Sequence, residues 1–384
     1  MDHMSRPLAR PALRLLLIAA ALFLLTGCGS RLATTNWAGL STDGRLVYLA
    51  FGPQVLAYDP AAQAQAWIHP AASTGAAFFA APAAADGRVV FGDYGHSGGL
   101  FSPRVTVSVY ALQEGDSAGA SQLWVNTSDA RDKIVAPALQ VGEQVFLGTA
   151  DNHILALDAT SGRLQWDYQT GHAIWGQPAF RDGTLYVASM DHSVYALDAA
   201  TGELKWSQAL GGALPSGPTL GDGLLYVSSF DGNVHALDMA TGEERWAAPS
   251  ADNWVWGAPA LLDGTLYFGD IGGTLYAVDA ATGEQKWTQE TQNAIQTSPV
   301  VSNDTLYVAS QVAAETPTGA LTAYNVTDGT QLWSEPTTTP LYATPVVVED
   351  ALVVSTQDAN ALLIGYDLAN GQELWRYALP QTSN

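Results

Sequence analysis

The sequence is poor in basic residues, with 15 Lys and Arg against 37 Asp and Glu in 384 residues. From Cys28 onward there are 12 basic and 36 acidic residues, a net charge of −24. This excess argues against nucleic acid and against an anionic lipid surface as binding partners. The acidic residues are scattered at turns rather than gathered in runs, so a solubilising surface accounts for most of them.

Cysteine is also nearly absent, and its one position is informative. Cys28 follows Leu25-Thr26-Gly27 and an apolar run, 15–25, that is too short to span the ~30 Å core of a bilayer comfortably. Arginines precede that run, as in a secretory signal. The stretch resembles the bacterial lipobox, which implies that residues 1–27 are a lipoprotein signal peptide and that Cys28 is lipidated. The alternatives are an uncleaved anchor and an ordinary signal peptide.

What the sequence does contain is a repeat built around tryptophan. Stretches such as YALDAATGELKW, ending at Trp206, place an Asp eight residues before a Trp. Six Trp have an Asp at this spacing, Trp333 has Asn325 there, and Trp124 belongs to a degenerate copy with Gln113 eleven residues before it. The eight Trp are separated by 57, 42, 40, 40, 41, 46 and 42 residues, a period typical of four-stranded propeller blades. We expect these indoles to dock between blades, and they are Trp67, Trp124, Trp166, Trp206, Trp246, Trp287, Trp333 and Trp375.

Each repeat reads as four short strands separated by turns. In one repeat, residues 174–180, 184–189, 193–198 and 203–207 are apolar or alternating, and Asp-Gly, Asp-His and Thr-Gly pairs lie between them. Asp198 and its equivalents are predicted to cap turns, because a catalytic carboxylate would not recur in every blade. The sequence therefore predicts an all-β, eight-bladed β-propeller of four-stranded antiparallel blades over residues 37–384, after a lipidated tether at 28–36.

The AxDxxTGxxxW pattern resembles the quinoprotein-type tryptophan-docking repeat of PQQ-dependent dehydrogenases and of their non-enzymatic relatives. A single-domain lipoprotein of this kind is similar to the BamB family of outer-membrane protein assembly factors. The resemblance covers residues 37–377 and implies the architecture more strongly than the activity.

The groups that a quinoprotein dehydrogenase needs are not visible in this chain. The resemblance implies an adjacent cysteine pair over the cofactor and Ca²⁺-binding carboxylates beside a catalytic Asp, but the predicted first strands are nearly free of carboxylates and Cys28 is the only cysteine. His153, His192 and His235 fall on successive blades without metal-ligand spacing and are expected to lie exposed at blade edges. We therefore expect no catalytic residue, no metal site and no cofactor.

One face of the propeller is predicted to bind partners. First strands are expected to begin near Trp37, Phe79, Ile134, Trp175, Pro215, Trp256, Gln296 and Tyr342, and insertions at 93–104 and 311–319 fall on that same face. The candidate partner-binding residues are Trp37, Phe79, Trp175, Trp254, Trp256 and Tyr342. Alternatively, these rings close the top of the channel as core, and the insertions are ordinary loop variation.

Three functions are compatible with these features. The first is a non-enzymatic scaffold, lipid-anchored outside the cytoplasm, that is monomeric by itself and binds protein or peptide partners, in outer-membrane protein assembly if the organism has an outer membrane. The second is a degenerate quinoprotein that binds a quinone cofactor or a small ligand. The third is an extracytoplasmic sensor.

Overall fold

The computed structural model describes residues 38–71, 75–97, 105–115, 119–248, 253–291, 293–312, 315 and 317–379. The predicted signal peptide, the tether with Cys28, and Trp37 lie outside the described residues. The described part is all β, so it includes no helix that could cross a membrane.

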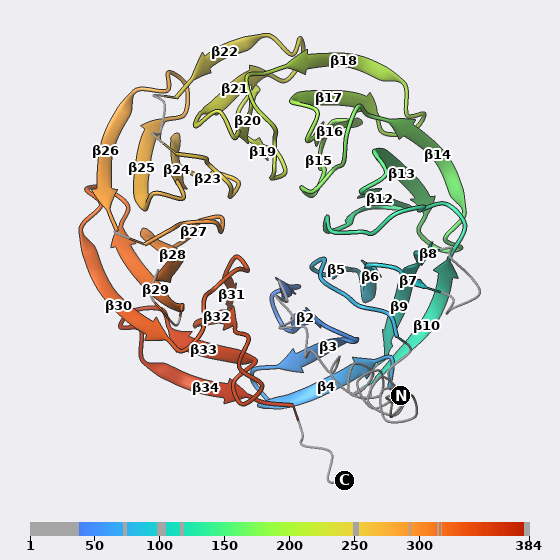
Figure 1. The fold of residues 1–384 in the computed structure, drawn as a ribbon, viewed down its shortest axis with the longest axis horizontal. Coiled ribbons are helices and arrows are strands. Elements are labelled where there is room, and N and C mark those ends of the chain that lie inside the picture. The colour runs from blue at the N-terminus through green and yellow to red at the C-terminus, as the bar shows by residue number, and fades with distance from the viewer. Residues whose placement is uncertain are drawn as a thin grey trace, which may run out of the picture. The chain divides into compact units, whose positions relative to one another are not determined.

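Eight four-stranded antiparallel sheets form a ring, which confirms the predicted eight-bladed propeller (Figure 1). In every blade the strands follow chain order from the axis to the rim. Blade one has β1 (Gly39–Thr42), β2 (Val47–Phe51), β3 (Gln54–Asp59) and β4 (Ala64–His69); blade two has β5 (Ala83–Ala85), β6 (Arg88–Gly92), β9 (Val109–Gly115) and β10 (Gly119–Asn126); blade three has β11 (Leu139–Val141), β12 (Gln144–Gly148), β13 (His153–Asp158) and β14 (Leu164–Gln169); blade four has β15 (Ala179–Arg181), β16 (Thr184–Ala188), β17 (Ser193–Asp198) and β18 (Leu204–Ala209).

The second half of the ring repeats this plan. Blade five has β19 (Thr219–Leu220), β20 (Leu224–Ser228), β21 (Val234–Asp238) and β22 (Glu244–Ala247); blade six has β23 (Ala260–Leu262), β24 (Thr265–Gly269), β25 (Thr274–Asp279) and β26 (Gln285–Glu290); blade seven has β27 (Val300–Ser302), β28 (Thr305–Val312), β29 (Thr318–Asn325) and β30 (Gln331–Thr337); blade eight has β31 (Val346–Val348), β32 (Ala351–Ser355), β33 (Leu363–Asp367) and β34 (Glu373–Tyr377). A small hairpin, β7 (His96–Ser97) and β8 (Val105–Thr106), is inserted into blade two.

The hydrophobic core lies between the blades. The two middle strands of a blade are buried along nearly their whole length because a neighbouring sheet covers each face, as β12 and β13 show. The outermost strands alternate between exposed and half-buried residues, as in β18, because only one of their faces meets the next blade.

The repeated tryptophans lock each blade to the next. The Trp206 indole Nε1 donates a hydrogen bond to the Met239 carbonyl oxygen of blade five at 3.1 Å. Gly242, in the next turn, has φ +77°, and an added Cβ there would lie 2.5 Å from Cε3 of the same indole. Trp67, Trp124 and Trp333 are buried, and the other five repeated tryptophans are half-buried. Corresponding indole-to-carbonyl bonds of 2.9 to 3.2 Å are made by Trp124, Trp166, Trp246, Trp287 and Trp333.

Where the repeat has its Asp, this residue shapes the turn that receives the indole. Asp198 Oδ1 accepts hydrogen bonds from the backbone N–H groups of Ala200 and Thr201 at 3.0 and 3.2 Å. Asp238 and Asp279 accept the same pair of bonds in their blades. These carboxylates therefore cap turns, which is the role that their recurrence indicates.

The ring closes without strand exchange. Blades one and eight are each built from one continuous segment, so side-chain contacts rather than a shared strand join these two blades in the described residues. The Tyr58 ring of blade one lies 4.9 Å from the Trp375 ring and 5.0 Å from the Tyr377 ring, measured between centroids. The Tyr377 hydroxyl donates to Gln65 Oε1 at 2.6 Å. Trp375 thus packs against a tyrosine at the closing contact.

The innermost strands begin later than the sequence pattern predicts. β15 begins at Ala179 rather than at Ile174, because residues 174–178 form a loop that is tied to the neighbouring blade. The Ile174 N–H donates to the Thr149 carbonyl oxygen of blade three at 3.2 Å. Pro178 has no N–H with which to extend the ladder. The first strands of blades two, three and five to eight likewise begin four or five residues later than predicted, after Phe79, Ile134, Pro215, Trp256, Gln296 and Tyr342.

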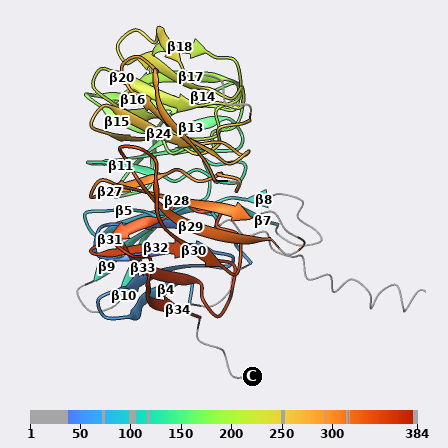
Figure 2. The same cartoon turned by 90° about the vertical axis from the view of Figure 1, so that its left-hand side faces the viewer.

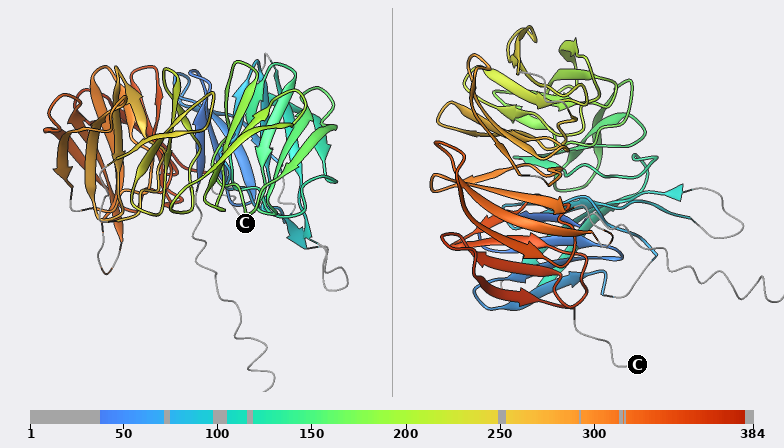
Figure 3. Two further views of the ribbon diagram at one scale, coloured as in Figure 1. Left: turned by 90° about the horizontal axis from the view of Figure 1, so that it is seen from above. Right: turned by 60° about the vertical axis from the view of Figure 1, so that its left-hand side comes forward.

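The two faces of the propeller carry different kinds of loop. The hairpin face carries the short turns between the first and second strands and between the third and fourth strands. The loop face carries the turns between the second and third strands and the connections from each blade to the next. Both longer hairpins, β7–β8 in blade two and the end of β28–β29 in blade seven, extend from the loop face (Figures 2 and 3).

Candidate functional site: an aromatic cluster on the loop face

Four aromatic side chains gather on the loop face of blades four to six. We call Trp175, Phe230, Trp254 and Trp256 the aromatic cluster. The Trp175 and Trp256 rings stack with centroids 6.4 Å apart, although they come from blades four and six. Pro215 stands at the equivalent place in blade five, so no third ring separates them.

Phe230 joins the two halves of the cluster. It lies in the turn between β20 and β21, and its ring centroid is 5.0 Å from Trp254 and 4.9 Å from Trp256. Trp175, Phe230 and Trp256 are half-buried, whereas Trp254 is 51% exposed. Three rings therefore form a supported platform, and the fourth presents its surface to solvent.

A network of charged groups holds the turn that carries Phe230. The buried His235 imidazole contacts Asp231 Oδ2 through Nε2 at 3.0 Å and Glu244 Oε1 through Nδ1 at 3.0 Å. Burial acts to raise the pKa of Asp231, but His235 and the Asn233 N–H favour its charged form, and the pKa lies below its usual value. In blade four the Tyr195 hydroxyl donates to Asp191 Oδ2 at 2.7 Å in the same place. The Phe230 turn is thus held rigidly under the cluster.

A second, smaller group of rings lies at blade two. Phe79 is half-buried and packs edge-on against Tyr94, with centroids 5.0 Å apart. The Lys133 ammonium lies 4.8 Å from the centre of the Tyr94 ring. This ring is therefore already covered by a cation from within the chain.

The remaining candidates do not join either group. Trp37 lies outside the described residues, and Tyr342 is half-buried without a ring contact to any described residue. Ile134, expected near the start of a first strand but not a binding candidate, is 1% exposed and packs in the core beside Gly92. The loop of blade three has the same length as that of blade four, but its proline, Pro137, stands one position earlier, and Val135 takes the place of Trp175.

Two of the rings, Phe230 and Tyr94, were not among the candidates from sequence. Both are the first or second residue after the second strand of their blades, and each donates its N–H to the loop before its own first strand. Aligning the turns between second and third strands across the repeat would have placed them together. The candidates from sequence came from one loop type only.

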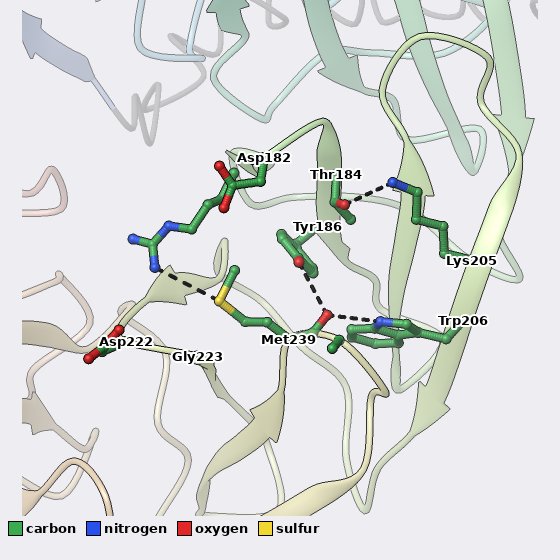
Figure 4. Close-up of a pocket in the computed structure, with 10 residues that line it drawn as sticks. Asp182, Thr184, Tyr186, Lys205, Trp206, Asp222, Gly223 and Met239 are labelled. Atoms are coloured by element: carbon green, nitrogen blue, oxygen red, sulfur yellow. Dashed lines mark hydrogen bonds between the residues drawn. The ribbon is translucent and has the colours of Figure 1, made fainter.

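The hairpin face carries a separate pocket between blades four and five, with a volume of about 400 Å³ (Figure 4). Its floor is a docking contact, since the Met239 carbonyl oxygen accepts bonds from both the Tyr186 hydroxyl at 3.2 Å and Trp206 Nε1. The Arg181 guanidinium donates to the Gly221 carbonyl oxygen, and Lys205 Nζ to Thr184 Oγ1 at 2.9 Å. Because these polar groups already bond to each other, mostly across the contact between blades four and five, the pocket follows from blade docking.

The donor groups of a quinoprotein metal site are not assembled in the described residues. They include no group of three His, Cys, Asp or Glu side chains placed to hold a metal ion. The chain also has no adjacent cysteine pair. The residues present therefore do not fit PQQ with its Ca²⁺ ion.

Known proteins place this fold and site in context. The family model of the outer membrane protein assembly factor BamB matches residues 28–173, 170–249 and 230–384. The chain belongs to this family. No curated protein matches the sequence.

Solved structures share the fold at low sequence identity. BamB from Moraxella catarrhalis is 22% identical, with a TM-score of 0.57, over 71% of this chain and 81% of that one. The quinohemoprotein alcohol dehydrogenase from Comamonas testosteroni is 15% identical, with a TM-score of 0.65, over 90% of this chain and 75% of that one. The computationally designed protein Ika8 is 17% identical, with a TM-score of 0.69, over 89% of this chain and 96% of that one. At these identities the three structures show that this chain shares their fold.

Proposed function

We propose that this protein is a non-enzymatic scaffold, anchored to a membrane through lipidated Cys28, that binds a protein or peptide partner with its loop face during outer-membrane protein assembly. Membership of the BamB family supports the process. The aromatic cluster supports the surface, because interface energy concentrates in a few aromatic anchors that rest on well-packed neighbours. The observation that carries the proposal is Trp254, 51% exposed on a platform of three packed rings.

A capture experiment tests this surface. The full chain, carrying an affinity tag, is isolated from detergent-solubilised native membranes, and co-purified proteins are quantified by mass spectrometry. Trp254→Ala should reduce the captured partner, since truncating an anchor costs ~2 kcal/mol or more of binding free energy. Leu204→Ala is the matched control, because Leu204 is 46% exposed but lies on the hairpin face of blade four. Equal capture by both variants and the wild type would move the binding surface elsewhere.

A degenerate quinoprotein is the second candidate function. The fold likeness to dehydrogenases, among them a europium-containing methanol dehydrogenase at a TM-score of 0.63 and 16% identity over 78% of this chain and 77% of that one, favours it. The missing donor groups oppose it, since the cofactor needs a base and a metal held beside it. Dye-linked alcohol oxidation by the purified protein, after incubation with PQQ and Ca²⁺, would support the dehydrogenase reading over the scaffold.

A further inference from the structure

The two groups of rings on the loop face occupy equivalent places in the repeat. Tyr94 and Phe230 each follow a second strand, and their N–H groups donate to the carbonyl oxygens of Ala77 and Ala213. Lys133 and Trp254 each precede a first strand in the next blade, and their carbonyl oxygens accept from the following turn, from Ala150 and Ile271. The pair Lys133 on Tyr94 therefore corresponds to the pair Trp254 on Phe230.

The two pairs differ in the group that lies over the ring of the second-strand turn, Tyr94 in one pair and Phe230 in the other. In blades two and three an ammonium group lies over the Tyr94 ring, which is the one cation–ring contact among the described residues. In blades five and six an indole takes the place of that ammonium, stacked at 27° on Phe230. The indole is the ring that attracts cations most strongly, and half of its surface is open. Trp254 thus stands where Lys133 stands, and its outer face is an aromatic surface on which no cation lies among the described residues.

The charges around the aromatic cluster are of one sign. Residues 164–290 contain four basic side chains, Arg181, Lys205, Arg245 and Lys286, and all of them lie next to turns of the hairpin face. On the loop face the same three blades carry Asp191, Asp231 and Asp270 in their turns between second and third strands. Asp270 is buried, whereas Asp191 and Asp231 are half-buried, so a cation approaching Trp254 would meet a negative potential and no Lys or Arg side chain of these blades.

We infer that the open face of Trp254 binds an arginine or lysine side chain carried by an extended segment of the partner protein. The inference rests on the proposed function and names the chemistry that the site recognises. The cation would stack on the indole while the neighbouring peptide lies against Trp256 and Trp175, whose rings are already packed side by side. The negative net charge of −24 after Cys28 would add attraction at longer range.

The test uses the full chain labelled with ¹⁵N-tryptophan and a capped Gly-Ser-Arg-Ser-Gly peptide. Binding is followed by the shift of the Trp254 indole N–H signal, which is assigned by its loss in Trp254→Leu. A second peptide carries citrulline, which keeps the shape of arginine but removes its charge. We expect the arginine peptide to bind roughly three- to tenfold more tightly than the citrulline peptide. Raising the NaCl concentration should reduce that ratio.

Several outcomes would overturn the inference. Equal binding of the two peptides would mean that apolar contact, not charge, is recognised. A Trp254 shift caused by a chitin or cellulose oligosaccharide but by neither peptide would make the indole a carbohydrate platform. Unchanged arginine-peptide affinity in Trp254→Leu, read from the Trp256 signal, would place the cation elsewhere. If capture from membranes depends on Trp254 while the peptides bind equally, the scaffold function stands and only this inference fails.

Discussion

A glycine lies against several of the docking indoles. The loss of unfolding free energy when this glycine is replaced by alanine should measure how closely two blades are packed at that contact. Gly202, in the turn of blade four, has φ +75°, and a Cβ added there would lie 2.7 Å from Cδ2 and Cε3 of Trp166. Gly202→Ala therefore combines two costs. The left-handed conformation costs ~1–2 kcal/mol for a residue with a Cβ, which the stiffer unfolded chain offsets by ~0.4–1 kcal/mol. The forced contact with a packed ring costs a further ~1–3 kcal/mol.

Gly183 provides a matched control in the same blade. Its φ is +73°, and a Cβ added there would have no atom within 4 Å. Gly183→Ala should therefore lose only the conformational cost, ~0–1.6 kcal/mol after the offset. The difference between the two variants, ~1–3 kcal/mol, isolates the contact between glycine and indole.

Urea unfolding followed by far-ultraviolet circular dichroism measures both losses, with equal m-values as the check that the same surface unfolds. Repeating Gly202→Ala in a Trp166→Ala background should remove the contact, so that the alanine costs no more than it does at Gly183. Equal losses for Gly202→Ala and Gly183→Ala in the wild-type background would refute this account of the docking motif. Failure of the Trp166→Ala background to relieve Gly202→Ala would refute it as well.

Three further predictions concern single residues. Trp206→Phe should cost ~1 kcal/mol in urea unfolding, because it removes the bond to the Met239 carbonyl oxygen while the Tyr186 hydroxyl still satisfies that oxygen; a loss as large as that of Trp206→Ala would contradict this. Because the pKa of Asp231 is lowered by folding, its stabilisation is present above the unfolded pKa of about 3.9 and is lost as the pH falls through the folded value. The urea midpoint of Asp231→Asn should therefore lie below that of the wild type at pH 7 and approach it below about pH 4, and a difference that is constant with pH would exclude the ionised carboxylate as its cause. Cys28→Ser should shift the protein from the membrane to the soluble fraction, with the wild type showing a diacylated residue 28 by intact mass.

The architecture could be predicted from the sequence because the repeat encodes it at several levels at once. The period gives the number of blades, and the Asp and Gly before each Trp give the turn that receives the neighbouring indole. In blade five Asp238 caps that turn and Gly242 lies against Trp206, so the Asp and the Gly of the motif have separate physical roles. Agreement between local turn chemistry and long-range packing is what makes such a pattern specific.

The aromatic cluster could be predicted only in part. Trp175 and Trp256 lie 81 residues apart in the sequence, and no periodic pattern indicates that their rings meet across the place of Pro215. Phe230 is set by a different loop type and is held through His235, a residue that by sequence alone resembles an exposed edge histidine. Apolar patterns also continue through the loop before β15, so the pattern could not show that residues 174–178 bond to blade three rather than to their own sheet.

The same contacts explain why recognition would concentrate on the loop face. On the hairpin face the turn length is fixed, because the Gly202 N–H donates to the Asp198 carbonyl oxygen at 2.8 Å and the glycine must also meet Trp166. An inserted residue there would break a docking contact between two blades. On the loop face the β28–β29 ladder continues to Val312 and Thr318 without altering the register of the strands beneath it. Loops on that face can therefore change in length and in aromatic content while the propeller stays closed. The exposed indole of Trp254 lies on this face, where such substitutions and insertions do not break a docking contact between blades.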